Sequence, residues 1–148
     1  MISRVLLVMM VLVYMGGCDG KTRDVNPVED ILEQDEKGNF TLYVSNQSFA
    51  ISPVDITIHI DGKKAVDRKF DVGNQHNWIG HSFSLSKGEH KLVAVSKKGS
   101  ARFEGKFEIK DKHWAVIDYC YYPDTSRGSG PTPKKFSFNI QDKPIYFQ

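Results

Sequence analysis

Apolar and polar residues alternate along most of the chain from residue 40 onward, which is the period of a half-buried β-strand. In residues 101–110, Ala, Phe, Gly, Phe and Ile lie on one side, and Arg, Glu, Lys, Glu and Lys lie on the other. Residues 54–60 alternate in the same manner, with Val and Ile on one side. Each of these segments therefore predicts a strand with one face toward a core and one toward water.

The same pattern predicts further strands, and turn-forming residues separate them. The expected strands are residues 40–45, 54–60, 64–71, 79–85, 89–97, 101–110, 113–122 and 135–141, with a last short one at 145–147. Asp61 and Gly62 supply the positive φ angles of a tight hairpin turn between two of them. Residues 113–122 are apolar on both faces, which predicts a central strand covered on each side. About eight short strands at this spacing predict an all-β fold, an antiparallel sandwich or barrel.

One stretch narrows the architecture to a sandwich. Residues 85–95 read Leu-Ser-Lys-Gly-Glu-His-Lys-Leu-Val-Ala-Val, with a turn at Gly88 and then His90, Leu92 and Ala94 on one strand face. This resembles the "leucine, x, x, Gly, x, His, x, Leu" pattern of extracellular bacterial immunoglobulin-like domains. The resemblance implies an immunoglobulin-like β-sandwich over residues 39–148, although the paired core cysteines of the true immunoglobulin pattern are missing.

The first residues have the layout of a secretory signal. Arg4 precedes an apolar run from Val5 to Met15, and Gly16 and Gly17 stand before Cys18. A secretory signal has a positive start, an apolar core of about 7 to 15 residues and small residues at the cleavage site. A transmembrane helix would need about 20 apolar residues, and this run is shorter. The layout resembles a bacterial lipoprotein signal peptide over residues 1–17. The alternative is an ordinary secretory signal that leaves Cys18 as a plain thiol.

The resemblance implies that Cys18 becomes the first mature residue, carries lipid and attaches the protein to a membrane that faces the periplasm or the outside. Asp19 resembles the residue that retains such proteins in the inner membrane rather than the outer one. Residues 18–38 form a polar tether in this interpretation. Within the tether, Asn26 as N-cap, Pro27 as first helical residue and Glu29 in a capping box predict a short helix that ends near Gly38.

Charge and cysteine content exclude several classes of protein. The 148 residues carry 20 Lys plus Arg and 18 Asp plus Glu, and these charges are interspersed. Nucleic-acid binding requires a concentrated basic face, so no nucleic-acid partner is expected. Of the 2 cysteines, lipid would occupy Cys18, so a disulfide framework is excluded and Cys120 is expected to be a buried small apolar residue.

Two segments carry groups that bind ligands. The loop before residue 79 gathers amides and an aromatic ring, and a Tyr pair lies at a strand end: Asn74, Gln75, His76, Asn77, Trp78, Tyr121 and Tyr122. An aromatic ring covers an apolar face of a sugar or peptide, and amides fix hydroxyl or backbone groups. The partner classes that fit are a carbohydrate or another envelope protein. The same residues also fit a structural turn in which Trp78 anchors the loop to the core.

Catalytic spacing is not evident in the chain. No two of the five histidines are two or four positions apart, and no Gly-x-Ser-x-Gly elbow occurs. We therefore expect no metal, no cofactor and a non-enzymatic binding or scaffolding domain. Two alternatives stay open: an envelope hydrolase or metal-dependent enzyme that uses His76 and His81, and a structural protein whose exposed edge strand pairs with a partner chain.

Overall fold

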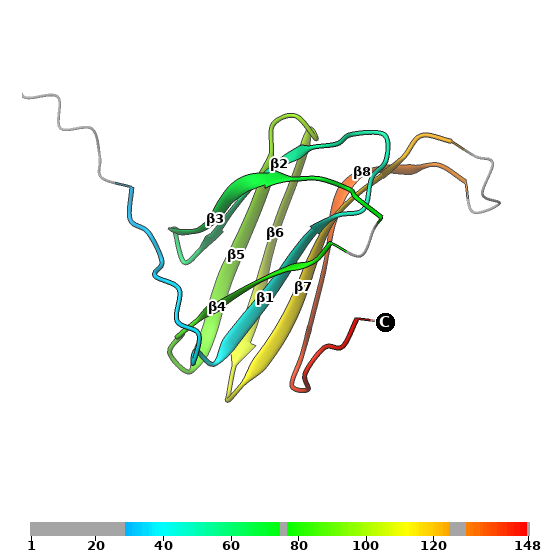
Figure 1. Ribbon diagram of the computed structural model, residues 1–148. Helices are drawn as coiled ribbons and strands as arrows, with labels where there is room; N and C mark the ends of the chain where they lie inside the picture. The colour runs from blue at the N-terminus through cyan, green and yellow to red at the C-terminus, as the bar shows by residue number, and fades with distance from the viewer. Residues whose placement is uncertain (1–28, 75–76, 125–129, 148) are drawn as a thin grey trace, which may run out of the picture.

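The computed structural model describes residues 29–74, 77–124 and 130–147, and over these residues the chain is all-β (Figure 1). Cys18 lies outside the described residues, as do Gln75 and His76. The described strands are β1 (Phe40–Asn46), β2 (Val54–Ile60), β3 (Lys63–Phe70), β4 (Ile79–Phe83), β5 (Gly88–Ser96), β6 (Ala101–Ile109), β7 (His113–Tyr122) and β8 (Thr132–Gln141). The prediction of an all-β fold with about eight strands over this region is therefore confirmed.

The strands form two four-stranded sheets, in the orders β4-β1-β7-β8 and β3-β2-β5-β6. All neighbouring strands are antiparallel except β1 and β7, which run parallel from Phe40 opposite His113 to Asn46 opposite Tyr119. The apolar strand β7 lies between β1 and β8, so its prediction as a central strand is confirmed. The hairpin between β2 and β3 turns at Asp61 and Gly62, whose φ angles are 51° and 81°.

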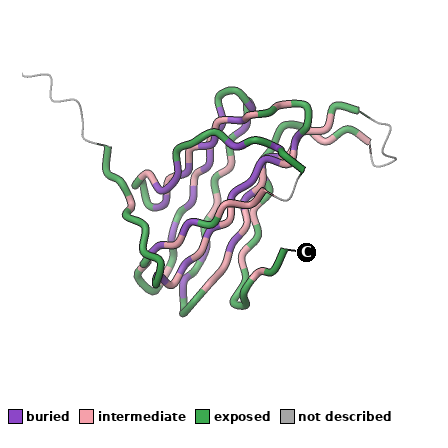
Figure 2. The backbone as a smooth tube through the Cα atoms, in the orientation of Figure 1, coloured by how far each residue is buried: buried purple, intermediate pink, exposed green. Residues whose placement is uncertain are grey.

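The core fills the space between the two sheets, and in most strands the buried residues recur at alternate positions (Figure 2). Phe40 of β1 stacks on Phe107 of β6 with ring centroids 4.9 Å apart, which joins one sheet to the other. His90, Leu92 and Ala94 are buried on the inner face of β5, as the sequence pattern around Gly88 predicts. Burial of these side chains is the main favourable contribution to folding.

The predicted short helix is wrong over residues 29–38, which we call the docking segment: it is extended as far as Asp35 and turns at residues 36–37. Its backbone pairs with both neighbouring sheet edges: Leu32 N–H donates to Lys64 O of β3 at 2.9 Å, and Asp35 N–H donates to Ser82 O of β4 at 2.8 Å. Edge strands present unpaired backbone groups, and an extended segment satisfies them whereas a helix cannot. The docking segment thus runs beside β3 and β4 (Figure 1).

The last predicted strand, at residues 145–147, is also wrong. After β8 the chain turns through Asp142, Lys143 and Pro144, and residues 145–147 have no strand pairing within the described part of the chain. The side-chain amide of Gln141 holds this turn by donating to Lys143 O at 2.9 Å. We call residues 142–147 the C-terminal tail, which turns back beside its own sheet (Figure 1).

Candidate functional site

The two sheets present different outer faces. On the sheet β3-β2-β5-β6 many outward side chains are charged and some pair across strands, as with Lys91 Nζ to Glu104 Oε1 at 2.5 Å and Lys106 Nζ to Glu89 Oε1 at 2.7 Å, whereas Val93 and Val95 are half-buried there. The other sheet carries aromatic side chains, which are Tyr43, Trp78, Trp114 and Phe147. Large apolar groups gathered on one outer face mark an interaction surface more often than a solvated one.

A hydrogen-bonded network lies on this aromatic face. Because β1 and β7 run parallel in this register, Ser45 stands beside Asp118, and its hydroxyl donates to Asp118 Oδ1 at 2.6 Å. The indole N–H of Trp78 donates to the same oxygen at 3.0 Å, and the amide of Gln47 donates to Ser45 Oγ at 2.8 Å. The network thereby fixes the indole ring of Trp78 against the sheet.

Asp118 is the ionisable group of this network. Burial raises the pKa of its carboxyl above the ordinary value, and the hydrogen bonds from Ser45 and Trp78 oppose that rise. Neither donor is charged. Among the described residues, the carboxylate is therefore held by neutral hydrogen-bond donors. A half-buried carboxylate beside a flat indole ring can bind polar and ring-bearing ligands.

The structure brings only part of the predicted binding set together. Trp78 and Tyr122 join one network, since the hydroxyl of Tyr122 donates to Gln47 O at 2.6 Å. Asn77 is half-buried beside Trp78 and donates to Asn46 O at 3.3 Å and to Asp71 O. The structure thus brings Trp78, Asn77 and Tyr122 together around the ends of β1 and β7, and their role in binding stays a prediction.

Two other members of the predicted set do not join them. Tyr121 lies on the opposite face of β7, where it packs against the core with Lys134 Nζ 5.3 Å from its ring centroid. Alternation along a strand separates adjacent residues in this way, so Tyr121 and Tyr122 cannot share a surface. Asn74 is exposed in the loop, and Gln75 and His76 lie outside the described residues.

The sequence reasoning missed the ring that lies on Trp78. Phe147 of the C-terminal tail stacks on the indole with centroids 4.2 Å apart and planes inclined by 11°. Its edge also meets Tyr43, with centroids 5.0 Å apart and planes inclined by 82°. We call the space between Trp78 and Tyr43 the ring slot. The signal in the sequence is the run Ile145-Tyr146-Phe147 after a proline, which alternation alone assigns to a strand.

Two histidines occupy structural positions. His81, one of the residues of the enzymatic alternative, is 7% exposed on the inner face of β4, and neither ring nitrogen has a partner among the described residues. Burial, with a smaller effect of the Arg68 charge, lowers its pKa. His90 joins two turns, since its ring nitrogens lie 2.6 Å from Asp61 Oδ2 and 2.8 Å from Ser86 O. Within residues 29–74, 77–124 and 130–147, no three His, Cys, Asp or Glu side chains gather as a metal site would require.

Cys120 is half-buried on β7 rather than fully enclosed, and it is a free thiol. Burial, together with the nearby charge of Asp118, raises its pKa. A thiol with a raised pKa is less ionised and therefore less reactive than an ordinary one.

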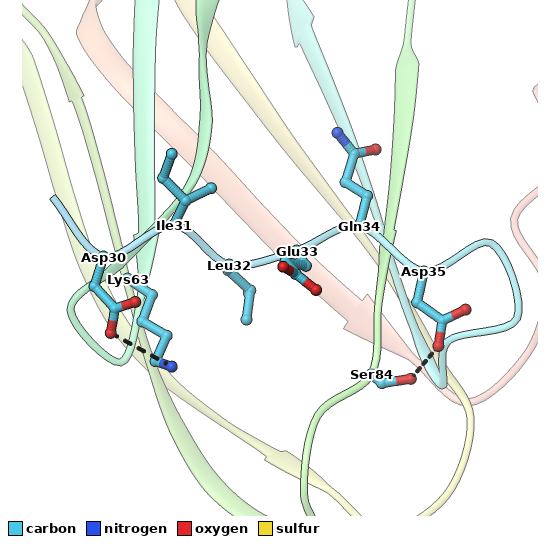
Figure 3. A pocket seen from close by; sticks show the side chains of 8 residues that line it. All are labelled: Asp30, Ile31, Leu32, Glu33, Gln34, Asp35, Lys63 and Ser84. Carbon is cyan, nitrogen blue, oxygen red and sulfur yellow. Dashed lines mark hydrogen bonds and ion pairs between the residues drawn. The ribbon is translucent and has the colours of Figure 1, made fainter. Parts of the chain in front are cut away.

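An open cleft of about 670 Å³ lies where the docking segment passes β3 and β4 (Figure 3). Its ends are closed by two polar contacts, Lys63 Nζ to Asp30 Oδ2 at 3.4 Å and Ser84 Oγ to Asp35 Oδ2 at 2.6 Å. The hydrogen bonds from Ser84 and from the Lys37 N–H lower the pKa of Asp35. Most of the lining residues belong to the docking segment, so the cleft is the gap between this segment and the two strands against which it packs.

Comparisons with protein-family models, with curated proteins and with solved structures found no match for this chain. In the part of the chain that the structure describes, no helix is long and apolar enough to cross a membrane.

Proposed function

We propose that this protein is a lipid-anchored, non-enzymatic module of a bacterial envelope whose β-sandwich binds or scaffolds another envelope component. The lipoprotein-like layout before Cys18 supports the anchor, and Asp19 favours the inner membrane. Several acyl chains hold a small protein firmly at a membrane, because each buried CH₂ contributes about 0.8 kcal/mol. The partner is an envelope protein or a carbohydrate.

The observation that carries the binding role is the difference between the two outer faces. The outer side of the sheet β3-β2-β5-β6 carries many charges, some of them paired, which water solvates well. The sheet β4-β1-β7-β8 instead holds Trp78, Tyr43 and Asp118 at half burial on its outer side. A domain with only a structural task would have no need of an aromatic outer face, so this face is the proposed contact with the partner. The turn at Gly88 and the buried His90 support an immunoglobulin-like subclass for the sandwich.

If Cys18 is lipidated, the docking segment limits the distance between the sandwich and the membrane. Backbone contacts of the segment with β3 and β4 hold Asp30 to Asp35 on the domain. The 11 residues from 18 to 28 precede Glu29, and an extended chain covers at most about 3.3–3.6 Å per residue. The domain would thus stand within roughly 40 Å of the lipid, close to the membrane surface.

The anchor is tested with Cys18→Ser and with Cys120→Ser as the matched control. We expect Cys18→Ser to leave the membrane fraction or to remain unprocessed, whereas Cys120→Ser stays attached, as measured by fractionation and by incorporation of labelled palmitate. A processed Cys18→Ser protein that remains on the membrane would contradict the lipid anchor.

The partner is sought by photo-crosslinking in the native envelope. A photoreactive phenylalanine analogue at Tyr146, which is 83% exposed beside the ring slot, probes the aromatic face. The same analogue at the exposed Lys106 probes the charged face. We expect adducts of defined mass from position 146 only. Equal adducts from both positions would show that the aromatic face is not the contact surface.

A second candidate function, pairing of an edge strand with a partner chain, is favoured by one observation at β8. From Phe136 to Gln141 this edge strand carries no charged residue, whereas β6, an edge strand of the other sheet, carries four. Uncharged edges invite strand addition. The double substitution Ser137→Lys and Asn139→Lys should then abolish association with the partner while leaving the circular dichroism spectrum unchanged. Association that survives this substitution would exclude β8 pairing.

A further inference from the structure

The ring slot is occupied by the chain's own tail, and the contacts that hold the tail are few. Among the described residues, Phe147 meets Trp78 and Tyr43 through ring contacts. Among the described residues, no backbone hydrogen bond joins residues 142–147 to the sheet. Phe147 remains 38% exposed and Tyr146 83% exposed. A tail held in this way opens readily compared with a hydrogen-bonded strand.

The slot itself is rigid, in contrast to the tail. The indole N–H of Trp78 is fixed by Asp118, and Asp118 is fixed by Ser45, which is fully buried. Tyr43 lies over Gly80, where a Cβ would stand only 3.1 Å from its ring, so the glycine makes room for the tyrosine. The two rings therefore keep their spacing when Phe147 leaves, and preorganised sites bind without a reordering cost.

We propose that the ring slot is a receptor for an aromatic side chain of an extended segment of another envelope protein, and that Phe147 closes it in the absence of that partner. This inference deepens the proposed binding function, because it names the group that the aromatic face recognises. The occupant seen in the slot is an aromatic residue on an extended peptide, so the geometry for such a residue is present.

A different protein fits the slot better than a second copy of this chain. The tail of a second copy would make the same two ring contacts as the tail already present, and the tail of the same chain has the higher effective concentration. A foreign segment that also contacts the outer face of β1 and β7 gains contacts beyond the two ring contacts of the tail, so it can displace Phe147.

The test uses a synthetic peptide, Asp-Lys-Pro-Ile-Tyr-Phe-Gln, which copies residues 142–148. It is titrated into the wild-type domain and into Phe147→Ala, with Tyr146→Ala as the matched control, and followed through the indole N–H resonance of Trp78. If the tail closes the slot most of the time, Phe147→Ala should bind the peptide about tenfold more tightly than wild type and Tyr146→Ala. The same peptide with its Phe replaced by Ala should not bind.

Equal binding of the peptide by wild type and Phe147→Ala, or binding that does not depend on the peptide's Phe, would overturn the proposal. A chain that ends at Pro144 repeats the test in case Phe147→Ala perturbs the fold. A wild-type dimer that disappears in this shortened chain would assign the slot to a second copy and would also overturn it. None of these results depends on Cys18, so the lipid anchor stands or fails separately.

Discussion

His90 shows how one buried residue makes stability depend on pH. Both of its ring nitrogens face acceptors, the carboxylate of Asp61 and the carbonyl of Ser86, and only the charged imidazolium can donate to both. Burial of the ring opposes the charge, but the hydrogen bonds to Asp61 and Ser86 prevail and raise the pKa of His90. A raised pKa of this kind contributes stability that is complete below the ordinary value of about 6.5 and is lost as pH rises through the folded-state value.

Asp61→Asn tests this linkage, because asparagine tolerates the left-handed φ of the turn and keeps an acceptor for the Lys91 N–H. Asp61 is 46% exposed, so solvent screens the pair. We expect the substitution to cost about 1 kcal/mol of unfolding free energy near pH 5.5 and clearly less near pH 8.5. Urea unfolding at both pH values measures the difference. Asp111→Asn in another exposed turn is the control, and a cost for Asp61→Asn that is equal at both pH values would exclude the charged pair.

The effect of His81 on stability changes with pH in the opposite direction to that of His90. Burial lowers its pKa, so the unfolded chain takes up a proton below about pH 6.5 that the folded ring does not accept. Its contribution is therefore present above that pH and is lost as pH falls. The alternation places both histidines in strands but does not predict the opposite shifts of their pKa values, because the partners of His90 lie in turns that only the fold brings together.

At the scale of elements, alternation predicts the strands well and the two ends of the domain poorly. The strands Val54–Ile60 and His113–Tyr122 have the predicted bounds, because one-sided burial imposes a period of two. The docking segment was predicted as a helix from local capping signals, but a helix of about ten residues is marginal alone. Two open sheet edges offer backbone partners instead, and a local pattern does not contain that information.

The candidate site likewise contains some residues that local sequence patterns could place and others that they could not. Trp78 and Tyr122 could be placed together because both stand at strand ends rich in polar groups. Asp118 and Ser45 could not, because they meet only through the parallel register of β1 and β7, which joins residues 73 positions apart. Phe147 depends on a tail that turns back, and an alternating run of three residues does not specify such a turn.

Gly38→Ala tests the docking segment. A Cβ at this buried glycine would collide with the carbonyl of Phe83 and would stand 2.9 Å from Asp35 O. We expect a loss of about 1–3 kcal/mol of unfolding free energy, as for other overpacked sites. Hydrogen exchange at the Asp35 N–H, which donates to Ser82 O, should become faster. Glu36→Ala at the exposed neighbouring position should change stability by less than about 0.5 kcal/mol, and unchanged exchange in Gly38→Ala would contradict this role of the glycine.

At the scale of the molecule, the sheet edges other than β8 are protected by different means. In the sheet β3-β2-β5-β6, both edge strands carry charged residues along their length, which discourages edge-to-edge pairing. In the sheet β4-β1-β7-β8, β4 reads Ile-Gly-His-Ser-Phe and carries no acidic or lysine side chain. The docking segment lies along this edge, where Asp35 N–H pairs with Ser82 O. We therefore expect the segment to keep the β4 edge from pairing with other chains, in addition to its part in the proposed anchor.

This role predicts a difference between two shortened chains, residues 29–148 and residues 39–148. Both retain all the strands of the sandwich, but the shorter one leaves the β4 edge uncovered. We expect the mass of the 39–148 chain, measured by light scattering after size exclusion, to rise with concentration more steeply than that of the 29–148 chain. Ser82→Lys in the 39–148 chain adds a charge to the same edge and should suppress the additional association. If the two chains behave alike at every concentration, the docking segment does not protect the edge, and its backbone contacts serve only to position the domain.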